Sequence, residues 1–524
     1  MAGMRSHSPC SETNGLLNDG DEVRDRLSDS EMEWQFGMVA PILKLPPELL
    51  VEILSLVVDS DPGLSLTARN GMSAPTLSLS HICSFWRETV ISTPSLWARI
   101  TVDLGYLNHQ RRGLVDIVRL YIQRSSNAWL ILGIQALRHG TNSDREEYIE
   151  EIPRLGWDVF QLMLDEHARW YRVSIKLRWT LFNQASEEVV GLTPAMNKQC
   201  NFPHLENLEI GWESSYWPRR STNRLFDFFK NNTPVLHTLI IPYYDSSYPF
   251  PFHQLTCVHL FDDDAWISAP AMLKSCSAID KLVLTCGPER IWTTANIVIT
   301  STSLKSLRLL MKDFVPAYET LSTLTLPSLV SLHLMTPDPG LSAFALARST
   351  SSDWKRKFWF RNCAEMIQRS GCQLEALVVD GNIFLDKQLL ELFTLTPNLR
   401  NLSIKTLSWY EPLLTDTFFQ QLALHSTHEE ENLLPKLTSI EMYVSDIDSI
   451  QPSKLASPNG ILSMVESRKG SCYPFSELEV FGLSADFDTD RGREWANRFR
   501  SEIEPRLLHF QDSGMLRVNL RINV

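Results

Sequence analysis

A short apolar template, Leu-x-x-Leu-x-Leu with conservative replacements, recurs along most of the chain and limits what it can fold into. Its copies are LENLEI from Leu205, LHTLII from Leu236, LTCVHL from Leu255, IDKLVL from Ile279, LKSLRL from Leu304, LVSLHL from Leu329, LEALVV from Leu374, LRNLSI from Leu399, LTSIEM from Leu437 and LEVFGL from Leu478. Weaker copies start at Trp97 and Trp170, and LRVNLRINV has the pattern of a closing strand. Copies at 255, 279, 304 and 329 follow one another after 24 or 25 residues, the period of a leucine-rich repeat.

The spacing within the template predicts a short strand, because alternate apolar residues lie on one side of an extended chain. The first leucine then packs at the turn that leads into the strand. Stretches between copies, such as 222–231 and 363–369, predict helical returns. One such unit cannot bury its apolar side alone, so neighbouring units must stack.

We therefore predict an α/β fold in which residues 101–524 form an irregular leucine-rich-repeat solenoid, a horseshoe with parallel β-strands. Insertions at 334–374, 404–437 and 442–478 interrupt the repeat and predict long loops. An ordinary α/β domain with leucine-rich strands is the alternative interpretation of the same pattern.

Net charge and cysteine usage restrict the partners and the compartment of the protein. The chain has 49 basic and 62 acidic residues, a formal net charge of −13, whereas a general nucleic-acid binder needs a basic face. None of the nine cysteines forms a Cys-x-x-Cys pair, which favours free thiols in a reducing compartment. No secretory signal is evident, and the apolar runs are too short to span a membrane. We expect a cytoplasmic or nuclear protein that binds neither nucleic acid nor membrane.

The first hundred residues have a different pattern. Residues 1–40 are rich in Ser, Asp, Glu, Asn and Gly, which predicts a disordered tail. Residues 41–100 predict a small all-helical module. Its first helix begins at Pro46 and Pro47, which suit a first helical turn, and has one wide apolar face made of Leu49, Leu50, Ile53, Leu54, Val57 and Val58. A loop-like stretch to residue 75 precedes a second helix, whose apolar stripe is Leu79, Ile82, Trp86 and Val90.

Three ordered blocks of this module resemble the F-box of fungal F-box-like proteins. The family pattern is Leu-Pro-x-Glu followed by paired aliphatic residues, then Val-Cys-x-x-Trp-Arg, then Ser-Thr-Pro-x-Leu-Trp. The matching residues are Leu45, Pro46, Glu48, Leu49, Leu50 and Ile53 in the first block, Ile82, Cys83, Trp86 and Arg87 in the second, and Ser92, Thr93, Pro94, Leu96 and Trp97 in the third. The interval 61–76 is longer than the minimal pattern.

The resemblance implies that the chain is the substrate receptor of a Skp–cullin–F-box ubiquitin ligase, which docks on a Skp-type adaptor and captures a target protein with its repeats. The residues it assigns to adaptor binding are Leu45, Pro46, Pro47, Leu49, Leu50, Ile53 and Leu54, with Trp86, Pro94, Leu96 and Trp97 bracing the module against the first repeat. The competing hypothesis is an interaction scaffold without a ligase, in which these helices only cap the repeat array.

The strand positions between the leucines predict a surface for the target protein. Read along the template, they place four basic or titratable residues in the middle of the array, namely His259, Lys281, Arg308 and His333. A cationic zone of this kind suits an acidic or phosphorylated segment.

No pattern in the sequence indicates catalysis. The nucleophile-elbow, phosphate-loop, zincin and dinucleotide patterns are all missing from the sequence, and the histidines are dispersed. We therefore predict a protein that is not an enzyme and that carries no cofactor, no catalytic residue and no metal site.

Overall fold

The computed structural model describes residues 42, 45–60, 63–67, 71–107, 112–139, 146–148, 152–177, 201–211, 229, 232–248, 250–261, 265–286, 298–311, 321–335, 352–380, 384–407, 414–425, 432–445, 457–469, 477–486 and 490–523. The tail predicted over 1–40 and the helical return predicted over 222–231, apart from residue 229, lie outside these residues.

One 16-stranded sheet runs through the protein, and it does not close on itself. In spatial order its strands are β2 (Gly71–Ser73), β1 (Leu64–Thr67), β3 (Arg99–Asp103), β4 (Leu130–Gln135), β7 (Trp170–Lys176), β8 (Asn207–Gly211), β9 (Thr238–Ile241), β10 (Cys257–Leu260), β11 (Lys281–Cys286), β13 (Ser306–Met311), β15 (Ser331–Met335), β16 (Ala376–Asp380), β17 (Asn401–Leu407), β18 (Ser439–Ser445), β19 (Val480–Asp486) and β20 (Arg517–Asn523). Only β1 and β2 pair antiparallel; every other neighbouring pair is parallel.

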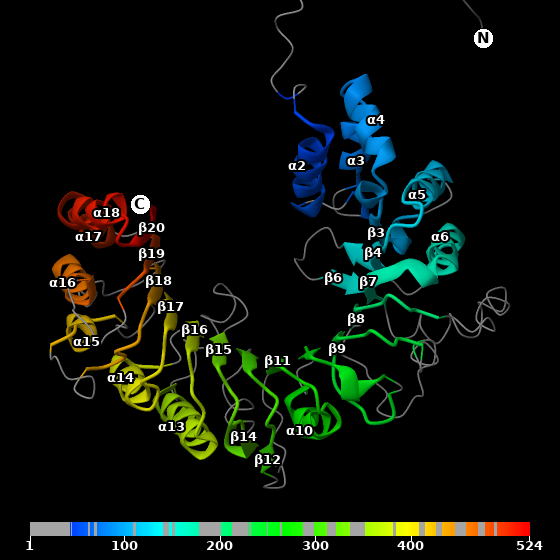
Figure 1. Cartoon of the computed structure of the whole chain (residues 1–524). Helices are drawn as coiled ribbons and strands as arrows, with labels where there is room; N and C mark the ends of the chain where they lie inside the picture. Colours follow the sequence, from blue (N-terminus) through cyan, green and yellow to red (C-terminus); the bar gives the residue numbers. More distant parts are fainter. Residues whose placement is uncertain are drawn as a thin grey trace, which may run out of the picture.

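The sheet forms the inner side of an open arc, and the helices after residue 100 cover its outer side (Figure 1). The described α-helices are α2 (Pro47–Ser60), α3 (Pro75–Leu79), α4 (Ser84–Ser92), α5 (Arg112–Arg124), α6 (Arg154–Asp165), α10 (Ala265–Ser275), α13 (Ser352–Ser370), α14 (Asp386–Thr394), α15 (Asp416–Leu422), α16 (Pro458–Lys469), α17 (Asp490–Arg498) and α18 (Glu504–Asp512). Two short pairs, β5 (Leu137–His139) with β6 (Glu146–Tyr148) and β12 (Ile299–Thr300) with β14 (Leu324–Thr325), stand apart from the main sheet.

Each copy of the apolar template forms a strand of this sheet that begins two residues after the first leucine, as β8 does after Leu205. The pairing register aligns equivalent positions, so that Leu282, Leu307 and Leu332 are neighbours across three strands. The apolar positions of every copy are buried, none more than 3 % exposed. These ladders of leucine and its replacements form the core between the sheet and the outer helices, which confirms the prediction of parallel α/β units.

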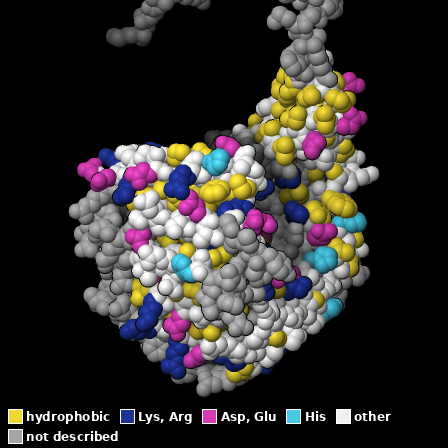
Figure 2. All heavy atoms as spheres, turned by 60° about the vertical axis from the view of Figure 1, so that its left-hand side comes forward, with side chains coloured by type: hydrophobic (Ala, Val, Ile, Leu, Met, Phe, Trp, Pro, Cys, Tyr) yellow, Lys and Arg dark blue, Asp and Glu magenta, His cyan; other side chains and the backbone are white. Residues whose placement is uncertain are grey.

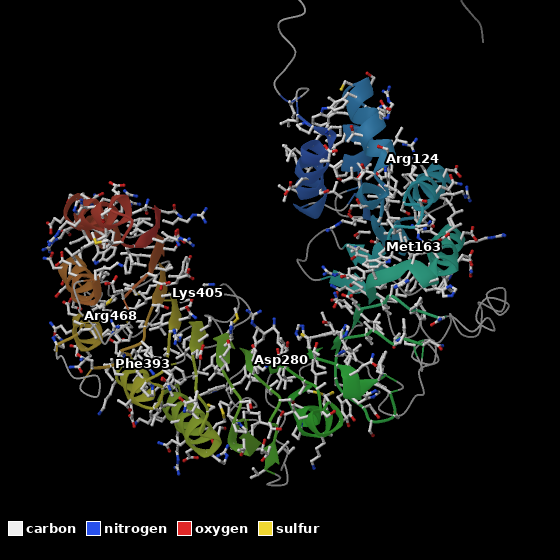
Figure 3. The ribbon with its side chains drawn as sticks, in the orientation of Figure 1. Arg124, Met163, Asp280, Phe393, Lys405 and Arg468 are labelled. Carbon is white, nitrogen blue, oxygen red and sulfur yellow. The ribbon has the colours of Figure 1, made fainter. Side chains whose placement is uncertain are left out.

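The outer helical layer contains a fully buried arginine, Arg468 of α16 (Figure 3). Its guanidinium donates to three backbone carbonyls, those of Leu422 (2.9 Å), Leu433 (2.9 Å) and Leu434 (3.0 Å). Burial lowers the pKa of Arg468 to about 10, so the group stays charged at neutral pH. Leu434 has a positive φ of 50°, and the bond to its carbonyl helps to hold this strained turn.

The prediction that residues 61–76 form a loop is wrong. Leu64–Thr67 is strand β1, which lies parallel to β3 and is buried along its whole length, and β2 extends the sheet beyond it. The module over 41–100 is therefore not all-helical. The stretch Leu-Ser-Leu-Thr has only four residues between polar segments, too few to show the alternating apolar pattern of a strand. It forms a strand because it pairs with β3.

The second predicted helix is in fact two helices, α3 and α4, separated at residues 80–83. Cys83 caps α4, where its Sγ accepts the Trp86 N–H at 3.5 Å. Ile82 therefore lies between the helices and is exposed, while Trp86 and Val90 point inward as the stripe predicted.

Trp97 fastens this N-terminal part to the rest of the sheet. The residue ends the 3₁₀ helix η2 (Pro94–Trp97), is fully buried, and donates its indole N–H to the Val90 carbonyl at 2.8 Å. Its ring meets Tyr121 of α5 edge-on at 4.8 Å, and the Arg124 guanidinium lies 4.6 Å from its centre. Burial raises the pKa of Tyr121 to about 12, so its hydroxyl remains protonated and donates to the Gly63 carbonyl at 2.8 Å.

We expect Trp97→Ala to reduce the free energy of unfolding by about 3–5 kcal/mol, because it removes a large buried side chain and its hydrogen bond. The measurement is urea denaturation followed by circular dichroism. Trp129→Ala is the matched control, since Trp129 is 54 % exposed, and we expect it to cost about 1 kcal/mol or less. Equal losses in the two variants would contradict the role of Trp97 as the joint.

Candidate interaction surfaces

Helix α2 has apolar side chains on two sides. Leu50, Leu54 and Val58, spaced by four residues, are buried, and α2 packs against α3, α4 and η2. The adjoining side exposes Leu49 (48 %), Ile53, Leu56 (66 %) and Val57. We call these four exposed residues the α2 surface. Figure 2 shows hydrophobic side chains gathered over the N-terminal helices. Exposed apolar groups concentrated on one small lobe are typical of a protein-binding site.

The residues predicted to bind an adaptor therefore fall into two groups. Pro46, Pro47, Leu49 and Ile53 are exposed, and Leu45 and Pro94 are partly exposed. The remaining five are buried, namely Leu50, Leu54, Trp86, Leu96 and Trp97. The prediction that Leu50 and Leu54 face a partner is wrong, because the side of α2 that carries them packs on the protein itself. Burial of Trp86, Leu96 and Trp97 agrees with the bracing role that was predicted for them.

Two basic side chains and a histidine lie on the inner face of the sheet, near the middle of the arc. Lys281, Arg308 and His333 come from the neighbouring strands β11, β13 and β15, and we call them the central cationic cluster. The Arg308 Nη2 lies 3.5 Å from the His333 Nδ1, and the His333 Nε2 lies 2.9 Å from the Ser331 hydroxyl. Within the described part of the chain, neither Lys281 nor Arg308 forms an ion pair, whereas Lys305 is paired with Asp280 at 2.9 Å.

These contacts define the protonation of His333. Partial burial and then the charges of Arg308 and Lys281 lower the pKa of His333. The neutral ring accepts from Arg308 at Nδ1 and donates from Nε2 to Ser331, which leaves the charge of Arg308 uncompensated.

His259, the fourth residue predicted for this surface, is set apart from the cluster. It pairs in register with Val283, whose side chain stands between it and Arg308. Burial lowers the pKa of His259, opposed by the nearby Glu209 and reinforced by Arg308 and Lys281. Its Nε2 is buried and finds no hydrogen-bond partner among the described residues. Glu209 is itself paired with Lys176 at 3.0 Å.

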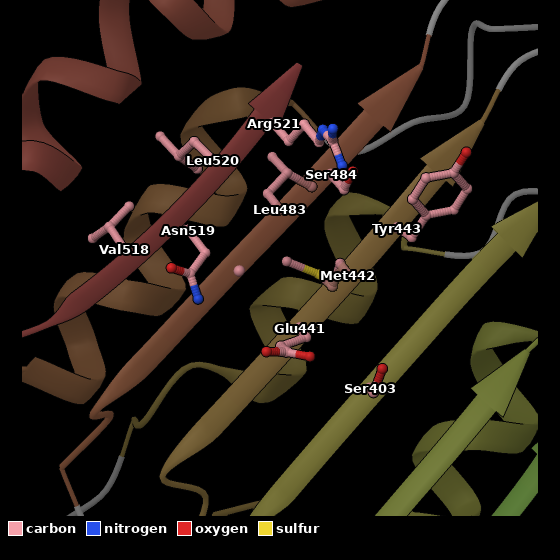
Figure 4. Close-up of a pocket in the computed structure, with 11 residues that line it drawn as sticks. Ser403, Glu441, Met442, Tyr443, Leu483, Ser484, Val518, Asn519, Leu520 and Arg521 are labelled. Carbon is pink, nitrogen blue, oxygen red and sulfur yellow. The ribbon is translucent and has the colours of Figure 1, made fainter. Parts of the chain in front are cut away.

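A hollow near the C-terminal end of the sheet was not predicted from the sequence. It has a volume of about 580 Å³ and lies over Gly482 of β19, between Glu441 of β18 and Asn519 of β20 (Figure 4). Ser403, Tyr443, Ser484 and Arg521 complete its polar lining. The only sequence signal was the glycine in the copy LEVFGL, at an inner-face position where neighbouring strands carry side chains.

Comparison with known proteins assigns no family to the chain. No protein-family model matches the sequence. A search of curated proteins finds no match either. Function must therefore be inferred from the surfaces themselves.

Neither a metal centre nor a membrane span is found in the described ranges. These ranges contain no group of three or more His, Cys, Asp or Glu side chains arranged to hold a metal ion. They also contain no helix with the length and apolar character needed to cross a bilayer.

We expect His333 to titrate with a pKa below 6.5, its ordinary value, and Arg308→Gln to raise that pKa toward 6.5. With this lowered pKa, the unfolded chain binds a proton at His333 more readily than the folded protein does. His333 should therefore lower the free energy of unfolding as the pH falls below 6.5. Histidine-labelled protein followed by NMR between about pH 5 and pH 8 measures the pKa. Arg361→Gln, on the exposed surface of α13, is the control and should leave it unchanged. A pKa of 6.5 or higher in the wild type would overturn the assignment.

Proposed function

We propose that this protein is the substrate receptor of a Skp–cullin–F-box ubiquitin ligase, a non-catalytic subunit that holds a target protein near the ubiquitin-transferring machinery. The single observation that carries the proposal is the α2 surface. Leu49 and Ile53, which belong to the sequence block that resembles the F-box, are exposed although they are large and apolar. An amphipathic helix that presents such residues fits the apolar groove of a partner.

The energetics favour a partner on this surface. Each large aliphatic side chain that leaves water contributes about 1.5–3 kcal/mol when it is fully buried. The α2 surface offers four such side chains on one helix, with the exposed Ile82 and Ile91 on the neighbouring segments. Because the four side chains are between 40 % and 66 % exposed, a Skp-type adaptor that covers them would gain about half of this energy. It would need no change in the helices, since Leu50, Leu54 and Val58 already anchor α2 on the protein.

The inner face of the sheet is the target-binding surface in this proposal, and the sheet with its helices is a leucine-rich-repeat solenoid. The 24- and 25-residue spacing of successive template copies and the stacking of parallel strands on an open arc support this assignment. A receptor of this kind works by raising the effective concentration of its target near a ligase, which requires a fixed geometry and no chemistry of its own. The buried joint at Trp97 supplies such geometry.

The reducing compartment that the cysteines favour is consistent with this role. Cys83, Cys257, Cys276, Cys363 and Cys372 are free thiols. Burial raises the pKa of Cys276 and of Cys363 to about 12, so both stay protonated and unreactive. We place the protein in the cytoplasm or the nucleus.

One observation favours the competing function, a scaffold in which residues 41–100 only cap the repeat array. Strands β1 and β2 extend the sheet at its N-terminal edge, and Leu64 and Leu66 of β1 are fully buried. A cap needs these strands and the inward side of α2, but it has no use for an exposed apolar α2 surface. The two functions therefore differ in what that surface does.

We expect the double variant Leu49→Asp with Ile53→Asp to lose binding to a purified Skp-type adaptor, because two charges would enter an apolar contact. Co-purification of the adaptor with the full-length chain measures this binding. Leu508→Asp, an exposed leucine on α18 at the other end of the arc, is the matched control and should bind like the wild type. Unchanged thermal unfolding of the double variant would show that the fold is intact.

If the wild-type chain does not bind the adaptor at all, the ligase function fails and the scaffold remains. If the double variant still binds, the adaptor uses a surface other than α2.

A further inference from the structure

We propose that the hollow over Gly482 binds a single basic side chain, lysine or arginine, of an extended target segment. This inference deepens the proposed function, since it rests on the role of the inner sheet face as the target-binding surface. Its first support is the glycine. Glycine weakens a strand interior, and where it occurs it often marks a place where a ligand or another chain approaches closely.

The space above Gly482 depends on the missing side chain. A Cβ at this position would come 3.2 Å from the Cγ of Glu441 and would fill the floor of the hollow. Glu441 and Asn519 are the register partners of Gly482 on either side, so their side chains form the walls (Figure 4). The volume of about 580 Å³ accommodates a long side chain.

Most of the polar lining has no side-chain partner among the described residues. Ser403, Glu441, Ser484, Asn519 and Arg521 form no hydrogen bond or ion pair through their side chains within the described ranges. Tyr443, which also lines the hollow, and Asn523 farther along β20 are hydrogen-bonded. The Tyr443 hydroxyl donates to Asp486 at 2.5 Å, and Asn523 also donates to Asp486 at 2.5 Å. The hollow is thus a local gap in an otherwise paired surface, which is expected of a site completed by a ligand.

The arrangement of the lining favours a cation. Glu441 carries the charge nearest to the floor, and the oxygens of Ser403 and Asn519 flank it in the same register row. A lysine ammonium or an arginine guanidinium donates to such a set and needs no acceptor in return.

Arg521 sets a limit on the sequence of the segment. It lies two residues beyond Asn519 on the edge strand β20, in the neighbouring row of the inner face. Its charge would repel a second cation next to the one over Gly482. The hollow therefore selects a lone basic residue flanked by neutral or acidic residues, and the net charge of −13 attracts such a segment to the protein as a whole.

The test uses the full-length chain and the peptides acetyl-Ala-Ala-X-Ala-Ala-amide, in which X is lysine, arginine, norleucine or glutamate. Dissociation constants come from ligand-observed saturation-transfer NMR. We expect the lysine and arginine peptides to bind about tenfold more tightly than the norleucine and glutamate peptides. Glu441→Gln should abolish this preference, whereas Glu479→Gln, an exposed carboxylate just before β19, should leave it unchanged.

A second variant tests the shape of the hollow. Gly482→Leu fills the floor and should weaken lysine-peptide binding about tenfold while glutamate-peptide binding stays the same. Thermal unfolding checks its fold, and Glu441→Gln gives the answer by itself if the leucine variant does not fold.

Four outcomes would each overturn the proposal. The norleucine peptide could bind as tightly as the lysine peptide, or the glutamate peptide could be preferred. The lysine peptide could show no binding at millimolar concentration, or Glu441→Gln could leave the preference unchanged. No adaptor is present in this experiment. Its failure therefore concerns the hollow alone, while failure of the adaptor co-purification concerns the α2 surface alone.

Discussion

Every strand of the sheet depends on its neighbours, because a strand of three to seven residues buries too little apolar surface to be stable alone. The leucine ladders solve this by repetition. Leu282, Leu307 and Leu332 each fill the space between two equivalent residues, and the register leaves no room for a shift by one residue, which would turn all of them outward. The arc, the helical layer and the inner face all follow from this one requirement.

The same requirement explains why the fold could be predicted where it was and not elsewhere. Each template copy identified a strand because leucine spacing directly reflects burial. The copies did not reveal β1, since Leu64 and Leu66 are only two apolar residues in a polar stretch and owe their strand to the neighbouring β3. The sequence also could not predict whether Leu49 or Leu50 is exposed. The apolar face of the helix includes both residues, and its pattern does not indicate which part packs on the protein.

The inner face could be predicted only as a set of positions. The template correctly identified His259, Lys281, Arg308 and His333 as strand residues between leucines, yet pairing across strands decides which of them meet. Register brings Arg308 to His333 and sets His259 apart behind Val283. The hollow over Gly482 could not be predicted, because it is formed by a missing side chain and by residues of four separate strands.

The central cationic cluster and the hollow lie on the same inner face with a fixed separation. Four strand-to-strand steps lead from β13, which carries the charged Arg308, to β18, which carries Glu441. At about 4.8 Å per step these two charges are roughly 19 Å apart, a distance that an extended segment covers in about six residues. A target segment that reaches both would therefore carry an acidic group at one end of this span and a basic residue at the other. Such spaced opposite charges would fix the direction of the segment as well as its position, because the reversed orientation would place each charge against its like.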